Sequence, residues 1–394
     1  MLLLQHSNEI KNSYYMDNKK NIGIVTYWNT EENYGQVLQL FALQWQLKKM
    51  HFCPFLLRIL PGMLPESVNE KYSTNKITFQ RLVDAIKKKL RKNQSPAIVE
   101  RNFQLFKNHY LSVSEREYTP KDLYHNVSEA DIYICGSDQI WNYPNPIYFL
   151  DWCSKSQKRI SYAASFGKSR IPDYQEEAYS NLLAQFDNIS VREKSGIEIC
   201  EKLVHSKNCM QCLDPTLLLS KEDYCSAINI IETKVYKKYI LLYLLGNKSN
   251  IDFDKIDNFA RDRNCEIIFV PSQGCAESRY KPTYPSIEKW LGLIKNAEYV
   301  ITNSFHGTVF SIIFQRNFFV LPLAGRDIRM NDRLYSLFDT LDIPYRPFCD
   351  NIIRDMPKMN YDKVDIKIKL LASKSVAFLE DSLHSCSVSK HIDL

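Results

Sequence analysis

Hydrophobic residues along the chain fall into two kinds of segment, and the two kinds alternate. Short apolar runs, such as NIGIVTYW (21–28) and FLLRIL (55–60), predict buried β-strands. The stretch between them, residues 33–50, has apolar side chains three or four positions apart, which predicts a helix. Because two parallel strands need a crossover connection, usually a helix, this order predicts a parallel sheet covered by helices.

The alternation continues and divides into two series. The first has further strands at 130–136, 159–167 and 188–193 and helices at 174–187 and 195–204. The second has strands at 238–246, 265–271, 298–304 and 317–323 and helices at 253–264, 286–297, 307–316 and 332–342. Two such series predict an α/β fold with two Rossmann-like domains facing a cleft, where ligands bind beyond the carboxyl ends of the strands.

The same pattern gives the expected boundaries along the chain. Residues 1–20 are polar and aperiodic and are expected to form a loose leader. An N-terminal Rossmann-like domain is expected over 21–225 and a C-terminal one over 235–345. Residues 361–382 have helical spacing and are expected to form a helix that packs back across either domain.

Composition is that of a soluble globular protein, with 45% hydrophobic and 24% charged residues among 394. The first residues, MLLLQHSNEI, contain too short an apolar run for a secretory signal. No stretch approaches the roughly 20 apolar residues of a membrane-spanning helix. The eleven cysteines are scattered without a framework spacing, so we expect free thiols in a cytoplasmic protein.

The formal net charge of +6 comes from one segment, residues 76–92. Seven basic residues there face a single acidic one, Asp84, and the rest of the chain is neutral overall, which argues against nucleic-acid binding. Apolar residues in this segment follow helical spacing. It is therefore either a basic amphipathic helix that contacts an anionic membrane at the inner face of the plasma membrane, or a helix packed on the first domain.

Two loops that follow predicted strands are candidates for ligand binding. Asn33, Tyr34 and Gly35 lie between the first strand and helix, where backbone amides can approach an anion; the alternative is an ordinary turn capped by Asn33. The second loop has small and polar residues followed by an aromatic one, a combination suited to sugar recognition. It contains Gly136, Ser137, Asp138 and Trp141. Its alternative is a turn with Asp138 as a cap and Trp141 in the core.

The segment from Thr302 to Thr308 is the strongest candidate, because it joins an apolar strand to an apolar helix. His306 at such a helix start could transfer protons near neutral pH, and adjacent amides could hold phosphate. Asn303, Ser304 and Gly307 would contribute to binding. The alternative is a helix-entry turn in which the imidazole satisfies backbone groups.

Arginines in loops form a further group of candidates, because a phosphate-plus-carboxylate substrate needs planar bidentate donors. The candidates are Arg192, Arg326, Arg329 and Arg333. A metal site has little support, because the zinc-like spacing of Cys209 and Cys212 lacks a second pair. Glycine-rich dinucleotide and P-loop motifs are also missing from the sequence.

Seven segments, in their order, resemble the polysaccharide pyruvyl transferase family. They are NYGQVLQLFALQ, ADIYICGSDQIWN, SYAASFG, SVREKSG, LDPTLLL, EYVITNSFHGTVFSIIF and the NDRLYSLFD helix. Each motif is weak alone, but seven in order over most of residues 21–342 are specific. The resemblance implies the two-domain arrangement of GT-B glycosyltransferases.

The resemblance also implies a reaction in surface polysaccharide biosynthesis. Pyruvate would pass from phosphoenolpyruvate to a sugar, or to a lipid-linked oligosaccharide, as a cyclic ketal. His306 would act as acid or base, Arg192 as a clamp for the donor and Asp138 on the acceptor side, with no metal or other cofactor. The alternatives are a nucleotide-sugar-dependent glycosyltransferase of the same architecture and a binding protein without catalysis.

One position departs from the family pattern. Some members carry Arg-Leu-His where this chain has Ser304, Phe305 and His306. The histidine aligns, whereas the arginine does not. Either Arg192 and the arginines between 326 and 333 hold the donor here, or the donor differs.

Overall fold

The computed structural model describes most of the chain. It covers residues 20–72, 96–125, 127–205, 208–232, 237–246, 251–272, 275, 279–322, 331–354 and 359–384. Several sequence predictions lie outside the described residues. They are the leader (apart from Lys20), the basic segment 76–92, Arg326 and Arg329.

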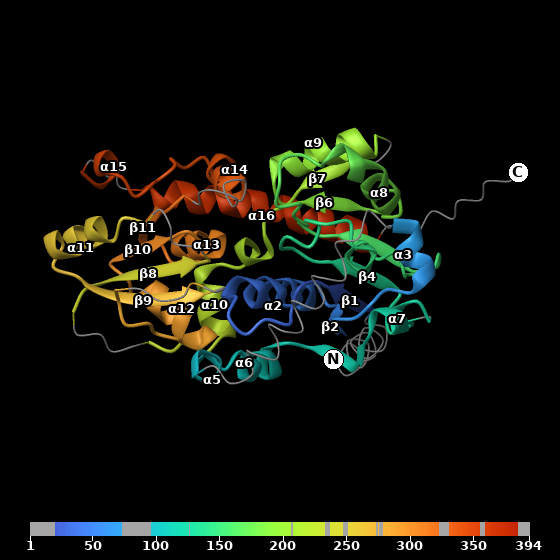
Figure 1. Ribbon diagram of the computed structural model, residues 1–394, viewed down its shortest axis with the longest axis horizontal. Helices are drawn as coiled ribbons and strands as arrows, with labels where there is room; N and C mark the ends of the chain where they lie inside the picture. The colour runs from blue at the N-terminus through green and yellow to red at the C-terminus, as the bar shows by residue number, and fades with distance from the viewer. Residues whose placement is uncertain are drawn as a thin grey trace, which may run out of the picture.

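The N-terminal half is built on a five-stranded parallel sheet (Figure 1). Its strands are β1 (Asn21–Val25), β2 (Cys53–Ile59), β3 (Val113–Tyr118), β4 (Ile132–Cys135) and β5 (Lys158–Ser161), in the order β3-β2-β1-β4-β5. A short parallel pair, β6 (Ile189–Val191) and β7 (Cys209–Gln211), lies next to β5. Isolated bridges from Ile160 to Asn188 and from Ala164 to Val191 join this pair to the sheet.

The C-terminal half contains a second parallel sheet, of four strands. They are β8 (Tyr239–Leu245), β9 (Glu266–Ser272), β10 (Tyr299–Thr302) and β11 (Asn317–Val320), in the order β11-β10-β8-β9. The central strands β8 and β10 are buried almost throughout, because helices cover both faces of a parallel sheet. The parallel pairing predicted from the strand–helix alternation is therefore confirmed in both halves.

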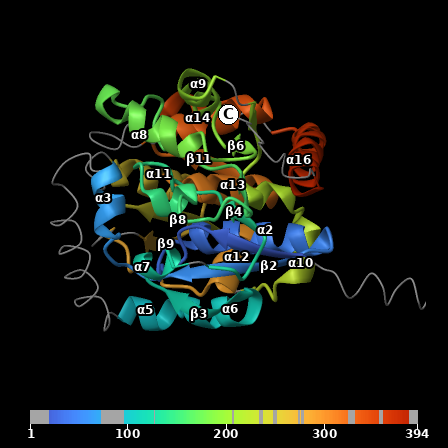
Figure 2. The ribbon, with the colours of Figure 1, turned by 90° about the vertical axis from the view of Figure 1, so that its right-hand side faces the viewer.

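Helices surround both sheets (Figure 2). Those of the N-terminal half are α2 (Tyr34–Lys49), α3 (Glu66–Tyr72), α5 (Pro96–Arg101), α6 (Phe103–Tyr110), α7 (Pro120–Leu123), η1 (Pro146–Phe149), α8 (Asp173–Leu183), α9 (Lys194–Leu203), η2 (Pro215–Leu218) and α10 (Lys221–Ala227). Those of the C-terminal half are α11 (Phe253–Asp262), α12 (Ile287–Lys295), α13 (Phe305–Ile313), α14 (Asp332–Leu341) and α15 (Asp350–Arg354), followed by α16 (Tyr361–His384).

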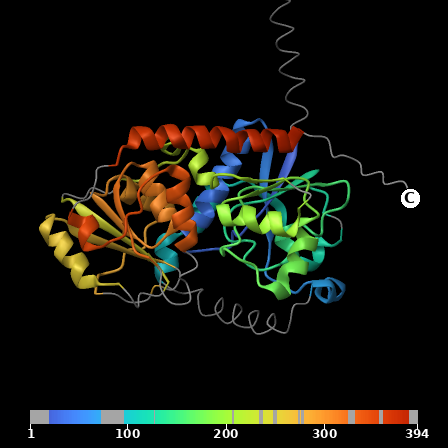
Figure 3. The same ribbon diagram turned by 90° about the horizontal axis from the view of Figure 1, so that it is seen from above.

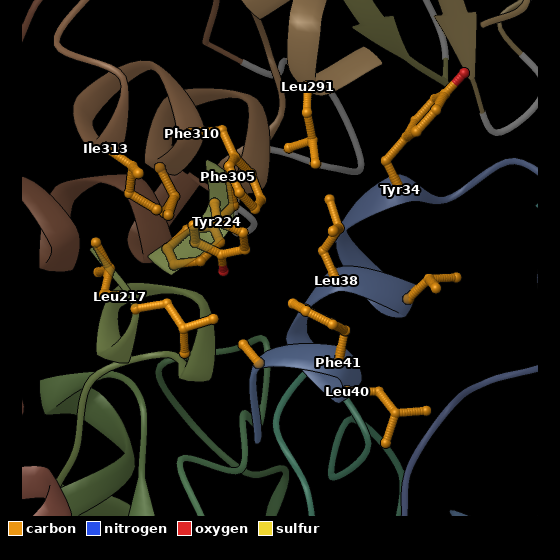
Figure 4. Packing of buried hydrophobic residues seen from close by; sticks show 14 of the residues in the cluster. Tyr34, Leu38, Leu40, Phe41, Leu217, Tyr224, Leu291, Phe305, Phe310 and Ile313 are labelled. Atoms are coloured by element: carbon orange, nitrogen blue, oxygen red, sulfur yellow. The ribbon is translucent and has the colours of Figure 1, made fainter. Parts of the chain in front are cut away.

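The two halves share one hydrophobic core, which runs along helix α2. Figure 4 shows side chains of α2 beside those of α13, η2 and α10. We call this contact the α2 seam; it consists of Tyr34, Leu38, Phe41, Tyr224, Trp290 and Phe310. The Tyr34 ring stacks on Trp290 with 4.8 Å between ring centroids, and its hydroxyl donates to the Pro285 carbonyl over 2.8 Å. The seam is thus a continuous apolar contact between the halves.

Helix α16 lies across both halves, as Figure 3 shows. The Gln315 amide of the C-terminal half donates to Asp365 over 2.8 Å. The Leu213 N–H of the N-terminal half donates to the Ser375 hydroxyl over 3.0 Å. Helix α16 spans the region predicted as a helix at 361–382, and it bridges the two halves.

Two boundaries differ from the predictions in ways that affect the candidate site. Strand β5 ends at Ser161 rather than continuing to Gly167, because Ala163 adopts φ +48°, outside the β region. Helix α13 starts at Phe305, two residues earlier than predicted, because the Ser304 side chain accepts the Gly307 N–H over 3.2 Å as an N-cap. His306 therefore lies in the first turn of α13.

Candidate active site

Polar residues that follow three strands meet where the two halves face each other. Ser137 comes just after β4, Arg192 just after β6 and His306 just after β10, so all three lie at carboxyl ends of parallel strands. Asp214, directly before η2, lies among them. We call this group the Asp214 cluster; its members are Ser137, Arg192, Glu193, Asp214, Thr216 and His306.

The Asp214 carboxylate is the centre of the cluster and is almost fully buried. Its Oδ2 accepts from the Ser137 hydroxyl over 3.0 Å and from Arg192 Nη1 over 2.8 Å. Its Oδ1 accepts from the Thr216 N–H over 3.0 Å and from the Thr216 hydroxyl over 2.7 Å. Burial alone would raise the pKa of Asp214, but His306 and Arg192 outweigh burial and hold this pKa well below its usual value. The carboxylate is therefore ionised at neutral pH.

Arg192 lies between two carboxylates and an aromatic ring. Its Nε donates to Glu193 over 2.8 Å, and Glu193 in turn accepts from the Ser165 hydroxyl over 2.9 Å. Its guanidinium carbon lies 4.4 Å from the centre of the Phe305 ring. Burial opposes its charge, but Glu193 and Asp214 outweigh burial and raise the pKa of the guanidinium. Nη2 is buried without a hydrogen-bond partner, so this fixed cation retains an unused donor.

The His306 imidazole is held between Asp214 and helix α2. Its Nε2 lies 3.5 Å from Asp214 Oδ2, which is too long for a strong hydrogen bond, and it has no other partner. On the other side of the ring lies Gly35. A Cβ at position 35 would come within 2.0 Å of His306 Nδ1, so a residue without a side chain is required there. The ring is fixed in place while one nitrogen stays unpaired.

Helix α14 brings a second guanidinium to the cluster. Burial and, to a smaller extent, the charge of Arg192 together lower the pKa of Arg333 to about 10. Arg333, Arg192, Asp214 and Phe305 line a small hollow of about 20 Å³. Because the surroundings disfavour the positive charge of Arg333, an anion bound in this hollow would be stabilised.

The sequence of this site and its surroundings matches a known family. The family model of the polysaccharide pyruvyl transferases covers residues 33–323, from α2 to the end of β11 and beyond. This chain belongs to the polysaccharide pyruvyl transferase family. The match spans more than half of the chain and includes every member of the Asp214 cluster. The resemblance seen in the seven sequence motifs is therefore confirmed.

Solved structures show that this family member has the GT-B type of fold. A Listeria monocytogenes protein described as a UDP-N-acetylglucosamine 2-epimerase aligns with a TM-score of 0.50 and 10% identity, over 94% of this chain and 98% of that one. Staphylococcus aureus MnaA, solved with UDP, gives 0.50 and 10% over 92% and 97%. Arabidopsis thaliana UGT89C1 gives 0.47 and 9% over 92% and 98%. No curated protein matches the sequence. The predicted arrangement of two Rossmann-like halves is confirmed.

In this pyruvyl transferase family member, several residues proposed from the sequence have structural roles instead. Trp141 was expected to face a sugar, but it is fully buried, stacks on Phe149 at 4.9 Å between centroids and donates from Nε1 to the Tyr148 carbonyl. Tyr34 belongs to the α2 seam. Both corrections have the same cause, since large rings gain more from burial among other rings than from exposure at a cleft.

Other proposed residues shape the backbone around the cluster. Asn33 caps α2 by accepting the Gln36 N–H over 3.2 Å. Asn303 exchanges two hydrogen bonds of 2.8 Å with the backbone of Leu245 and so links the end of β10 to β8. Gly136 and Gly307 permit close approaches; a Cβ at 307 would lie 2.7 Å from Thr302 Oγ1. These residues have structural roles around the site, and their proposed part in substrate binding stays a prediction.

Asp138 lies at the edge of the cluster and has an unusual backbone. It adopts φ +81°, a conformation that aspartate tolerates better than most residues, and its side chain is buried. Its charge acts on both Arg192 and Arg333. Asp138 thus stays a candidate for the acceptor side.

Sequence reasoning missed Asp214, Glu193 and Thr216. Asp214 and Thr216 lie in the LDPTLLL motif, which was used only for the family resemblance. The available signal was an acidic residue flanked by buried apolar residues and followed by Pro215 and Thr216, because a buried carboxylate must have partners. The sequence alone could not identify the partners of Asp214.

A larger hollow, of about 1150 Å³, lies elsewhere, between the end of α2, the start of α10 and α16. Helices α2 and α13 both begin near the Asp214 cluster, and this hollow lies at their opposite ends. Its lining includes none of the buried polar atoms that lack partners in the described part of the chain. The Asp214 cluster is therefore the stronger candidate site despite its smaller hollow.

The described residues contain no group of three or more histidine, cysteine or acidic side chains arranged to hold a metal ion. Over the same residues, none of the helices is both long and apolar enough to span a membrane.

Proposed function

We propose that this protein transfers pyruvate from phosphoenolpyruvate to two hydroxyl groups of a sugar, forming a cyclic ketal at the Asp214 cluster. The observation that carries the proposal is the buried, unpartnered Nη2 of Arg192 next to the destabilised charge of Arg333. Two neighbouring guanidiniums suit a small substrate that has both a phosphate and a carboxylate.

Arg333 could replace the arginine that the Arg-Leu-His pattern has at the position of Ser304. Ser304 has a neutral hydroxyl, which caps α13, so it cannot supply a cation. In the proposal, Arg333 of α14 supplies the second guanidinium, opposite Arg192. The chain would then hold the same donor with an arginine from a different helix.

His306 would handle the proton in the reaction. Protonation of the methylene carbon of phosphoenolpyruvate gives a methyl group and a cationic carbon at C2. A sugar hydroxyl attacks C2 and gives up its proton, the C2–O bond to phosphate breaks, and a second hydroxyl attacks and loses its proton to close the ketal. Asp214 would orient the imidazole and stabilise its protonated form across the 3.5 Å between them.

The products released test the proposal against its two alternatives. We expect phosphoenolpyruvate to raise the melting temperature of the protein and an acceptor glycan to trigger phosphate release. Stabilisation by UDP or GDP without any response to phosphoenolpyruvate would instead support the alternative of a nucleotide-sugar-dependent glycosyltransferase. Binding of a glycan with no product of either kind would indicate a binding protein.

A further inference from the structure

The backbone that leads into Asp214 is held by side chains from two distant parts of the sequence. The Leu213 N–H donates to the Ser375 hydroxyl of α16 over 3.0 Å, and the Leu213 carbonyl accepts from the Tyr162 hydroxyl over 3.1 Å. Tyr162, just after β5, is fully buried, and Ser375 is 2% exposed. Because each peptide unit is planar, these two bonds restrict where the Cα of Asp214 can lie.

The Ser375 hydroxyl accepts from Leu213 because its own hydrogen is used elsewhere. It donates to the Leu371 carbonyl, one turn earlier in α16, over 2.9 Å, which leaves its oxygen as the acceptor. Ser373 makes the same kind of bond within α16, to the Lys369 carbonyl over 2.9 Å, but its side chain is exposed. Ser375 thus differs from Ser373 by its burial and by its contact with Leu213.

Helix α16 connects this contact to the C-terminal half of the molecule (Figure 3). Near the start of the helix, Asp365 accepts from the Gln315 amide over 2.8 Å. The Tyr361 hydroxyl also donates to the Arg316 carbonyl. Gln315 and Arg316 lie just after α13, whose first turn carries His306. The imidazole and the central carboxylate of the cluster come from different halves, yet both are tied to α16.

The contact between Asp214 and His306 is the one most sensitive to a movement of the carboxylate. Its other partners, Ser137, Arg192 and Thr216, lie 2.7–3.0 Å away and belong to the same half as Asp214. His306 Nε2 lies 3.5 Å away and belongs to the other half. A shift of Asp214 therefore changes its distance to the imidazole first.

We propose that Ser375 is a positioning residue, which holds Asp214 at its working distance from His306; the inference rests on the proposed function. Without the Ser375 hydroxyl, the buried Leu213 N–H loses its acceptor, and an unpaired buried donor is costly. The backbone then turns toward another partner, and Asp214 moves with it. A misplacement of about 1 Å at a reacting site can lower turnover by roughly 10²-fold.

NMR of the imidazole signals tests this positioning without any substrate. The full chain is made with isotope-labelled histidine, and His306→Gln assigns the signal of His306. We expect Ser375→Ala to shift this signal at neutral pH. Ser382→Ala is the matched control, because Ser382 is 1% exposed on the same helix and its hydroxyl has no hydrogen-bond partner among the described residues. Ser373→Ala controls for the bond within α16, and both controls should leave the signal in place.

Turnover separates positioning from a general loss of stability. Ser375→Ala should lower the kcat of phosphate release about ten-fold. The KM for phosphoenolpyruvate should change little, because Glu193 still holds Arg192. Tyr162→Phe keeps the ring and removes only the hydroxyl that holds the Leu213 carbonyl, so it should act in the same direction. It also tests the same backbone segment if Ser375→Ala does not fold.

The outcomes distinguish a failure of this inference from a failure of the proposed function. An unchanged His306 signal in Ser375→Ala, or an equal shift in Ser382→Ala, would overturn the inference even where phosphoenolpyruvate still raises the melting temperature. A higher KM with an unchanged kcat would overturn it too. If the signal moves only in Ser375→Ala and phosphoenolpyruvate has no effect, Ser375 still positions Asp214 and the donor is wrong.

Discussion

The two halves of the molecule meet in two very different ways. Along the α2 seam, Tyr34 and Leu38 pack against the rings of Trp290 and Phe310 in one apolar core. In the Asp214 cluster, hydrogen bonds and ion pairs join polar and charged side chains. Two buried nitrogens, Arg192 Nη2 and His306 Nε2, have no hydrogen-bond partner. The seam is thus a hydrophobic contact, whereas the cluster is an electrostatic one.

The difference shows which contact holds the halves together. Burial of apolar area stabilises the seam, where the Trp290 Nε1 alone lacks a partner among the named seam residues. Each unpaired buried donor in the cluster costs about 1–3 kcal/mol. The cluster has two such groups, Arg192 Nη2 and His306 Nε2, and little apolar area to offset them, which supports our proposal that a ligand binds there.

The seam and the cluster meet at two adjacent residues of α2. Tyr34 lies in the seam, and the next residue, Gly35, touches the His306 ring. The backbone of α2 next to the seam therefore limits the position of the imidazole, although His306 makes no strong hydrogen bond to Asp214.

The largest expected effect comes from His306, on the cluster side of the comparison. His306→Gln should lower turnover roughly 10²–10⁴-fold, because glutamine cannot transfer protons. Stability should change little, since the seam is untouched. Steady-state phosphate release and urea unfolding measure the two effects, and turnover within a few-fold of the wild type would return His306 to a structural role.

Trp290 provides the opposite test, on the seam side. Trp290→Ala should lower the free energy of unfolding by about 3–5 kcal/mol, because it leaves a large cavity in the shared core. Phosphoenolpyruvate should still raise the melting temperature of the folded variant. Trp45→Ala, at a half-buried position of α2, is the control and should cost clearly less. Equal losses in the two variants would contradict a seam that holds the halves together.

Sequence reasoning worked where burial is continuous and failed where contacts are distant. Strand β8 (Tyr239–Leu245) was predicted nearly to the residue, because its run of apolar residues fits a strand buried on both faces. Strand β3 (Val113–Tyr118) was missed, since this edge strand has four exposed residues among six and reads as polar.

The site shows the same limit. Motifs placed Arg192 and His306 correctly at strand ends, yet Asp214 was overlooked. Its partners Ser137 and Arg192 are 77 and 22 positions away in the sequence. Trp141 was misplaced for a similar reason, since its burial depends on Phe149, Phe166 and Phe186, which come from separate segments.

Acid should weaken the cluster before it weakens the seam. The folded-state pKa of Asp214 is depressed, so its stabilising effect is complete above the ordinary carboxyl pKa near 4 and is lost as pH falls below it. This group alone would contribute a slope of up to about 1.4 kcal/mol per pH unit in that range. Urea unfolding between pH 6 and pH 3 should show a shallower decline for Asp214→Asn than for the wild type. Parallel pH curves would contradict the depressed pKa.

The smallest expected effect is a change in the KM for phosphoenolpyruvate when Arg333 is replaced. It tests which cation of the cluster contacts the donor. Burial and the charge of Arg192 lower the pKa of Arg333 to about 10, which still leaves arginine protonated at neutral pH. Lysine starts from a lower ordinary pKa, about 10.4, and the same surroundings would bring it closer to neutrality. Arg333→Lys should therefore raise the KM for phosphoenolpyruvate, and the increase should grow between pH 7 and pH 9 as the amine loses its proton. Lys194→Arg, at the exposed start of α9, is the control and should leave this profile unchanged. A KM increase that is the same at every pH would show that the fork geometry alone matters, and no increase at all would remove Arg333 from the donor site.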